Sequence, residues 1–205
     1  GANSHLLLSL VPRWVWLAYA ALVGLCLGSF CNVVVHRLPR GQSLWPRSVC
    51  PGCAMPIRWY DNVPLLSFAM LRGRCRRCAR WIGWRYPAVE AGVALLWVSA
   101  ILRYGATTEG VGVATFATCL VPVALIDLET LTIPDSLNVM VLLNGIGAAF
   151  SALTPVTPRS AMMAAVAGAA LFGAIVVATR GMGTADILLA AGLGANLGLE
   201  GLVIA

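Results

Sequence analysis

The sequence is poor in charge. It contains no lysine and only eight acidic residues, and charged residues make up 11% of its 205 positions. Soluble domains usually carry about 25% charged residues, whereas 60% of this chain is hydrophobic. So little polarity excludes an intrinsically disordered chain, a small disulfide scaffold and almost any soluble enzyme. The composition therefore predicts a protein that crosses a membrane several times.

The positive charge is concentrated in one polar stretch. All 14 basic residues are arginine, and ten of them lie between positions 36 and 86, where Asp61 is the only acid. A basic segment can bind nucleic acid, but beside a membrane span the positive-inside rule explains it better. We therefore expect a cytoplasmic loop whose placement is reinforced by anionic membrane lipid, and no nucleic-acid partner.

Apolar runs of spanning length occur six times. A transmembrane helix needs about 20 mostly apolar residues, and the candidates are 12–35, 87–104, 110–127, 134–153, 161–179 and 185–205. The expected fold is an all-α polytopic membrane protein of about six transmembrane helices with a small zinc-ribbon-like cytoplasmic loop domain. Because the chain ends in apolar residues, we also expect it to be short at its C-terminus.

The alternation of these spans brings two acids to one membrane face. If the basic loop is cytoplasmic, the third span ends in the cytoplasm near Asp127, and the sixth begins there near Asp186. These residues are 59 positions apart in the chain, yet both reach the cytoplasmic side. An ionisable residue at the edge of a span is costly and is a functional candidate for that reason.

Two such carboxylates can act as an aspartic-protease pair, in which one activates water while the other polarises a carbonyl. Other roles remain open: Asp186 can cap its own helix, and Asp127 can pair with an arginine. Asp135 is a competing acid, although its position after Pro134 favours a role at a helix N-terminus. We expect Glu90, just inside the second span, to pair with an arginine.

Four cysteines form paired Cys-x-x-Cys units, Cys50 with Cys53 and Cys75 with Cys78, separated by 21 residues. Four thiolates at this spacing are typical of a structural tetrahedral zinc site, although the gap slightly exceeds the usual 15–20 residues. A reducing compartment argues against disulfides, while a redox dithiol remains the alternative. The other cysteines, Cys26, Cys31 and Cys119, lie in apolar runs and are expected to act as small hydrophobic residues.

Five elements in this order resemble the type IV prepilin peptidases, which are membrane aspartic proteases that mature type IV pilins and type II secretion pseudopilins. They are a Gly-Ser-Phe-Cys-Asn signature within 28–39, the cysteine pairs flanking 62–75, Arg-Tyr-Pro with Glu at 85–90, an acidic Ile-Pro-Asp motif at 127–135, and Gly-Met-Gly leading into an aspartate at 181–186. The resemblance covers nearly the whole chain. It implies that Asp127 and Asp186 are the catalytic pair.

The resemblance also implies a substrate and a division of the chain. The family cleaves a short basic leader at the cytoplasmic face of the bacterial inner membrane, and members with the four cysteines commonly N-methylate the new N-terminus with S-adenosylmethionine. The implied parts are 1–35 with the first transmembrane helix, 36–86 as the tetracysteine zinc-binding domain, and 87–205 as the peptidase core. No glycine-rich Rossmann fingerprint independently supports methyl transfer.

This sequence departs from the family pattern near its second motif. Where the family has Gly-x-Gly-Asp, Ala185 replaces the second glycine, and Leu188 stands where a lysine is usual. An alanine adds a Cβ and disfavours positive φ. Two other functions remain alternatives: a non-catalytic membrane scaffold with a zinc knuckle, and a membrane thiol oxidoreductase.

Overall fold

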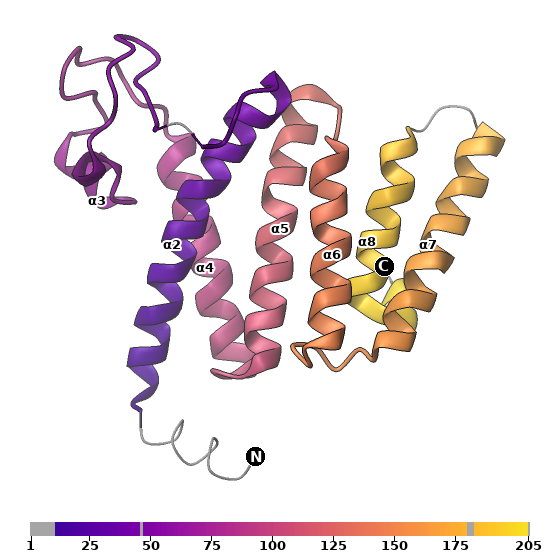
Figure 1. Ribbon diagram of the computed structural model, residues 1–205. Helices are drawn as coiled ribbons and strands as arrows, with labels where there is room; N and C mark the ends of the chain where they lie inside the picture. The colour runs from indigo at the N-terminus through magenta and orange to yellow at the C-terminus, as the bar shows by residue number, and fades with distance from the viewer. Residues whose placement is uncertain (1–10, 46, 180–182, 205) are drawn as a thin grey trace. The chain divides into compact units, whose positions relative to one another are not determined.

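The computed structural model describes residues 11–45, 47–179 and 183–204, and consists of two compact units, one ending at Leu102 and one beginning at Arg103. Within the described residues the structure is helical, and its β-pairing is limited to two isolated antiparallel bridges. Figure 1 shows the helices as coiled ribbons, with the loop that carries α3 emerging from the first unit. The expected all-α fold with a small loop domain is confirmed.

The first unit is built on an antiparallel pair, α2 (Arg13–Arg37) and α4 (Arg85–Tyr104). Two side-chain bonds to backbone fix its register: Arg13 donates to the Leu102 carbonyl at 3.2 Å, and Asn32 donates to the Tyr86 carbonyl at 3.0 Å. From Arg13 to Asn32 the helix rises about 28 Å at 1.5 Å per residue. The paired segment therefore matches a hydrocarbon core about 30 Å thick.

The contact between α2 and α4 depends on two glycines spaced four residues apart, Gly24 and Gly28. A Cβ built on Gly24 would lie 2.5 Å from the Ala94 Cα, and one on Gly28 would lie 2.7 Å from the Glu90 Cα. Small residues at this spacing let membrane helices approach closely enough for backbone packing.

The segment between α2 and α4 contains two short 3₁₀ helices, η1 (Leu38–Arg40) and η2 (Trp59–Asn62), and one short helix, α3 (Leu66–Met70). Three aromatic rings connect α3 to the end of the segment. Phe68 lies 5.9 Å from Trp81 and 5.2 Å from Trp84, and the two indoles are 5.7 Å apart, measured between ring centroids.

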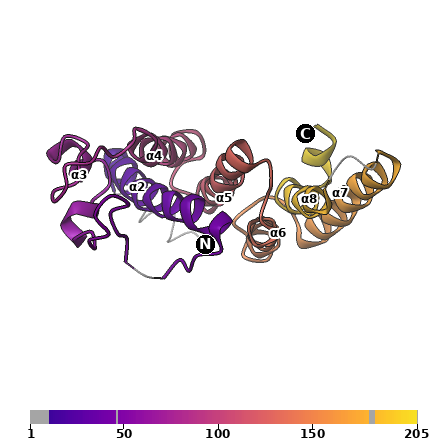
Figure 2. The same cartoon turned by 90° about the horizontal axis from the view of Figure 1, so that it is seen from above.

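The second unit contains α5 (Thr108–Thr130), α6 (Asp135–Phe150), α7 (Pro158–Thr179) and α8 (Thr184–Ile204). Within this unit α6 lies between α5 and α8 in both views (Figures 1 and 2). Small residues again permit close packing, because a Cβ on Gly168 of α7 would meet the Ala190 carbonyl oxygen of α8 at 2.6 Å.

Five of the described helices are long and apolar enough to cross a membrane: α2, α4, α5, α7 and α8. The sixth expected span appears as α6, an apolar helix of 16 residues. The helix boundaries lie close to the runs that hydropathy predicted.

Candidate functional site

The four paired cysteines come together in the first unit. The sulfur atoms of Cys50, Cys53, Cys75 and Cys78 all lie within 4.8 Å of one another, and the Cys50 and Cys78 sulfurs are 3.8 Å apart. Sulfurs bound to a tetrahedral zinc at about 2.3 Å would be separated by about 3.8 Å. All four are free thiols. The cluster could therefore hold a metal ion such as zinc.

Two hairpins of the same design position these sulfurs. The backbone N–H of Cys50 bonds the Met55 carbonyl at 2.9 Å, and the N–H of Cys75 bonds the Arg80 carbonyl at 2.9 Å. In each hairpin the residue after the second cysteine is an alanine in the left-handed region, with φ of 54° at both Ala54 and Ala79. Each Cys-x-x-Cys therefore turns tightly, so that its two sulfurs face inward.

Backbone N–H groups point at the first sulfur of each hairpin. Gly52 N and Cys50 Sγ are 3.4 Å apart, and Arg77 N and Cys75 Sγ are also 3.4 Å apart. The N–H groups of Cys78 and Arg77 lower the pKa of the Cys75 thiol to about 6. The Arg80 N–H lowers the pKa of Cys78, but burial and the three neighbouring thiols outweigh it and raise that pKa to about 11.

This electrostatic pattern fits a cation at the centre. The Cys75 sulfur is stabilised as a thiolate, and the Cys78 thiol resists ionising beside it because like charges at short range repel. A divalent ion removes that penalty, because it binds all four groups as thiolates.

An ion pair braces the loop beside this cluster. The Arg76 guanidinium contacts both carboxylate oxygens of Asp61, with its shortest N···O distance at 2.6 Å. Asp61 is the only acid in a stretch with ten arginines. The hydrogen bonds from Arg76 hold the pKa of the Asp61 carboxyl below its usual value.

Asp127 lies in the last turn of α5 and is half-buried. Its backbone carbonyl accepts the N–H of Leu131 at 2.8 Å, and Leu131, with φ of 52°, ends the helix in the left-handed region. The chain then turns through Pro134 into α6. This turn places the side chain of Asp127 one short loop away from the start of α6.

Asp186 is the third residue of α8 and is also half-buried. Its Oδ2 accepts the backbone N–H of Gly183 at 3.1 Å. This bond is the carboxylate half of a capping box, so the helix-capping role is present. It engages one of the two carboxylate oxygens. Gly181 and Met182, which belong to the same expected motif, lie outside the described residues.

The alanine that replaces the family glycine is helical in this structure. Ala185 is the second residue of α8, whose one described non-helical position is Gly198. Positive φ is therefore not needed at position 185, and the Cβ of an alanine is compatible with the backbone there.

Both candidate aspartates lie at the same end of the second unit. Figure 1 shows the C-terminal end of α5 and the N-terminal ends of α6 and α8 at its top. Asp127 and Asp186 are therefore on helices that flank α6. Asp135, the first residue of α6, is exposed at this end, where a carboxylate faces the positive end of the helix dipole.

Sequence reasoning missed Asn138, which joins α6 to the start of α8. Its side chain is fully buried, and its Nδ2 donates to the carbonyl of Ala185 at 2.9 Å, next to Asp186. Asn196 makes a similar bond deeper in the unit, donating to the Val141 carbonyl at 2.9 Å. An asparagine within an apolar run is the only signal that the sequence offered.

Glu90 has a different partner from the one we expected. The carboxylate of this buried α4 residue accepts the backbone N–H of Leu65 at 2.8 Å, and the Ser29 side chain is its other polar neighbour. The prediction of an arginine partner was therefore wrong, because a backbone amide of the loop, that of Leu65, occupies the hydrogen-bonding position at the carboxylate.

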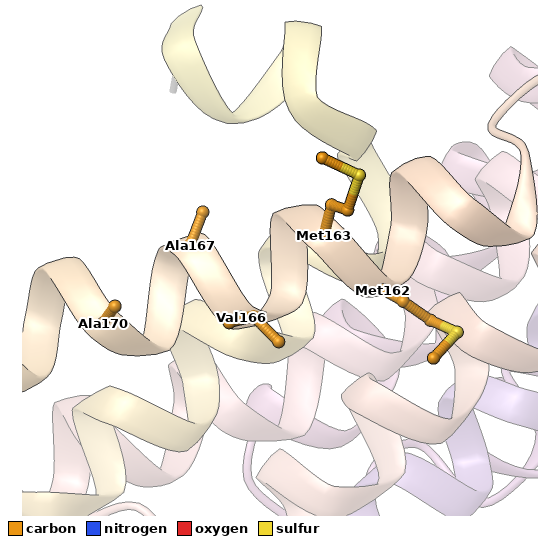
Figure 3. A pocket seen from close by; sticks show the side chains of 5 residues that line it. All are labelled: Met162, Met163, Val166, Ala167 and Ala170. Atoms are coloured by element: carbon orange, nitrogen blue, oxygen red, sulfur yellow. The ribbon is translucent and has the colours of Figure 1, made fainter.

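A shallow depression of about 420 Å³ lies on α7, lined by Met162, Met163, Val166, Ala167 and Ala170. Figure 3 shows that all five side chains come from this one helix. The lining contains no titratable group, and three of its members are largely exposed. This surface suits lipid and offers nothing to a hydrolytic reaction.

Family comparisons agree with the order of these elements along the chain. Residues 22–104 match the model of the bacterial peptidase A24 N-terminal domain, and residues 114–205 match the model of the type IV leader peptidase family. A Burkholderia pseudomallei (strain 1026b) protein named "Prepilin leader peptidase/N-methyltransferase" is 35% identical over 230 residues, which cover 94% of this chain and 72% of that protein. The chain belongs to the type IV leader peptidase family.

Two further relatives carry the same name. The Myxococcus xanthus (strain DK1622) protein is 42% identical, and the Klebsiella pneumoniae protein is 36% identical. The alignments cover 85% and 92% of this chain, respectively. The chain spans 54% of the length of the Myxococcus relative and 88% of that of the Klebsiella relative. No solved structure matches the chain.

Proposed function

We propose that this chain is a membrane aspartic endopeptidase that removes the basic leader of type IV prepilins or type II secretion pseudopilins. One observation carries the proposal: Asp127 and Asp186 lie at the same end of one helical unit, on the two helices that flank α6. Family membership supplies the substrate class, because the relatives are named for prepilin processing. Sites at the ends of membrane helices suit a scissile bond that adjoins a hydrophobic helix.

The reaction needs one carboxylate and one carboxylic acid, which act as a pair. The ionised member takes a proton from water as the water oxygen attacks the scissile carbonyl carbon. The protonated member donates its proton to the carbonyl oxygen, which gives a neutral gem-diol. When the C–N bond breaks, one diol proton returns to a carboxylate and the leaving amine takes a proton from the other carboxyl.

The surrounding residues support this chemistry. Gly183 bonds one oxygen of Asp186, which fixes the carboxylate at the helix start. Asn138 holds the Ala185 carbonyl, so the first turn of α8 is tied to α6. In this proposal the substrate backbone would lie over the first turn of α6, between the two helix ends that carry the acids.

The same proposal assigns the parts of the chain. The segment 36–86 would hold zinc through Cys50, Cys53, Cys75 and Cys78, and 87–205 would form the peptidase core. Zinc held there would be structural, since the four cysteine sulfurs would fill all four positions of a tetrahedral ion. The proposal puts 36–86 and the two aspartates on the cytoplasmic face of the bacterial inner membrane, and the positive-inside rule supports it through the ten arginines of 36–86.

The relatives' names include "N-methyltransferase", and S-adenosylmethionine as the methyl donor is implied only by the family resemblance. The described residues show no strand followed by a glycine-rich turn and helix, which is the usual nucleotide-binding arrangement. Nothing in the geometry identifies residues that fit this cofactor, so we derive no methyl-transfer step.

The test is leader cleavage of a prepilin in membranes that contain this chain or a variant. We expect Asp127→Asn and Asp186→Asn each to reduce the cleavage rate by about 10³-fold or more, as loss of one member of a catalytic pair does. Glu109→Gln, a change at the first turn of α5 and therefore at its opposite end, is the matched control and should retain cleavage.

Each alternative function predicts a different result. A non-catalytic scaffold would tolerate both aspartate substitutions in any assay of partner binding and would cleave nothing. A thiol oxidoreductase would show a reversible disulfide within the cysteine cluster and no bound metal. Cleavage that survives both aspartate changes would overturn the proposed mechanism.

A further inference from the structure

The short helix α3 exposes apolar side chains that the fold leaves uncovered. Leu66 and Met70 are 57% and 71% exposed, and their spacing of four residues places them on one face of the helix. On the other side, Phe68 packs against Trp81 and Trp84, and Trp84 itself is 68% exposed. We call Leu66 and Met70 the α3 apolar face.

The depth of this face follows from a single hydrogen bond. Asn32 and Tyr86 mark the upper end of the paired membrane helices, and Glu90 lies four residues further into α4. At 1.5 Å per residue, Glu90 is about 6 Å below Tyr86. Because the Leu65 amide bonds the Glu90 carboxylate at 2.8 Å, the start of α3 is held within one side-chain length of that depth.

Figure 1 agrees with this placement, since α3 lies at the level of the upper part of α4. A depth of 5–10 Å below the headgroup boundary is where interfacial helices bury their apolar faces. Apolar side chains at such a depth meet lipid, and indoles are enriched there.

The backbone N–H groups at the start of α3 have hydrogen-bond acceptors within the protein, as a segment in an environment with little water requires. The Leu65 N–H donates to the Glu90 carboxylate. The N–H groups of Ser67 and Ala69 donate to the carbonyls of Val63 and Leu65, respectively, at 3.0 Å each. The Ser67 hydroxyl also donates to the Val63 carbonyl. Internal satisfaction of backbone groups is the main requirement for a segment in lipid. The bond from the Leu65 N–H also gives the Glu90 carboxylate, which lies inside a span, a hydrogen-bond donor.

The positive charge next to the α3 apolar face indicates lipids with anionic headgroups. Arg72 and Arg74 follow α3 directly, and both are exposed. Arginines beside an apolar face suit anionic headgroups, which attract basic residues at the cytoplasmic surface of a membrane.

We propose that α3 is an interfacial anchor, in which Leu66 and Met70 insert at the acyl–headgroup boundary while Arg72 and Arg74 bind anionic headgroups. The anchor holds the metal-binding hairpins against the membrane surface, because Trp81 connects α3 to the hairpin of Cys75. This inference depends on α2 and α4 spanning the membrane and is independent of the peptidase reaction.

Photo-crosslinking of the full chain tests the anchor. Benzoylphenylalanine is introduced at Met70, at Leu95 as a span control, and at Met55, a less exposed methionine in the first cysteine hairpin. The chain is placed in vesicles of phosphatidylcholine with phosphatidylglycerol, and lipid adducts are identified by mass spectrometry. We expect Met70 to capture acyl chains at a yield close to that of Leu95 and several-fold above that of Met55.

A Met70 yield no greater than that of Met55 would overturn the proposal. The charge arm uses the double variant Arg72→Gln and Arg74→Gln, which should lower capture by Met70 several-fold in the anionic vesicles and leave capture by Leu95 unchanged. Equal capture by Met70 with and without the two arginines would refute the headgroup contact. Prepilin cleavage, measured on the same samples, reports the peptidase proposal separately.

Discussion

Replacing Gly24 with alanine should weaken the α2–α4 pair, although alanine is the better helix former. A Cβ at this position would lie 2.5 Å from the Ala94 Cα and 2.9 Å from the Val93 carbonyl oxygen. Both atoms belong to backbone, so neither can turn away as the end of a flexible side chain can. The two helices must separate to admit the methyl group.

Gly92 in α4 is the matched control. A Cβ there would meet nothing within 4 Å. The same substitution should therefore stabilise the helix by up to about 1 kcal/mol, the usual difference between glycine and alanine. At Gly24 this gain is offset by an overpacking cost of about 1–3 kcal/mol. The two variants should thus differ in stability by about 1–3 kcal/mol, with Gly24→Ala the less stable.

The assay is unfolding in mixed micelles by titration with dodecyl sulfate, followed by tryptophan fluorescence. The midpoint should fall or stay unchanged for Gly24→Ala and rise for Gly92→Ala. Equal midpoints for the two variants would refute the close helix contact, because a helix-propensity effect alone treats both glycines alike.

Three other predictions concern the loop and the start of α8. Cys75→Ser should reduce bound zinc, measured by atomic absorption on the purified protein, to a small fraction of the parent value; unchanged zinc would contradict the cluster. Asp61→Asn should destabilise the loop by less than about 1 kcal/mol at neutral pH, because the pair with half-exposed Arg76 is partly screened. Because the pKa of Asp61 is lowered, the stabilisation from this pair is present above pH 3.8, the ordinary value for the group, and is lost as the pH falls below it. Unfolding of the parent and the variant is followed by fluorescence. A stability difference between the two that persists below that pH would argue against the pair. Ala185→Gly should lower the thermal midpoint slightly and leave prepilin cleavage within a few-fold of the parent rate, because position 185 is helical; a large gain in cleavage would mean that positive φ is needed there.

The sequence predicted the membrane helices well because hydropathy alone determines where a chain can cross lipid. The expected span at 87–104 appears as α4 with bounds Arg85–Tyr104, and the expected run at 161–179 as α7, which starts three residues earlier. The cysteine cluster could also be predicted from the sequence, because two Cys-x-x-Cys units at this spacing are typical of a single four-sulfur metal site.

Contacts between segments distant in sequence were harder to predict. Glu90 was expected to pair with an arginine, because ten arginines lie in the preceding loop, yet the structure gives it the Leu65 amide. Asn138 belongs to no recognisable motif, and its bond to the Ala185 carbonyl depends on which helix packs against α6. Both cases depend on tertiary packing, which composition and periodicity do not encode.

The catalytic roles of Asp127 and Asp186 remain predictions, and the most direct test compares three acids at one end of the same unit. Leader cleavage of a prepilin is measured in membranes for Asp127→Asn, Asp186→Asn and Asp135→Asn, with the N-terminus of the product sequenced. We predict loss of about 10³-fold or more for the first two and retention of most activity for Asp135→Asn, whose carboxylate is exposed at the start of α6. The proposed pair would be contradicted if Asp135→Asn lost prepilin cleavage while Asp127→Asn or Asp186→Asn retained it.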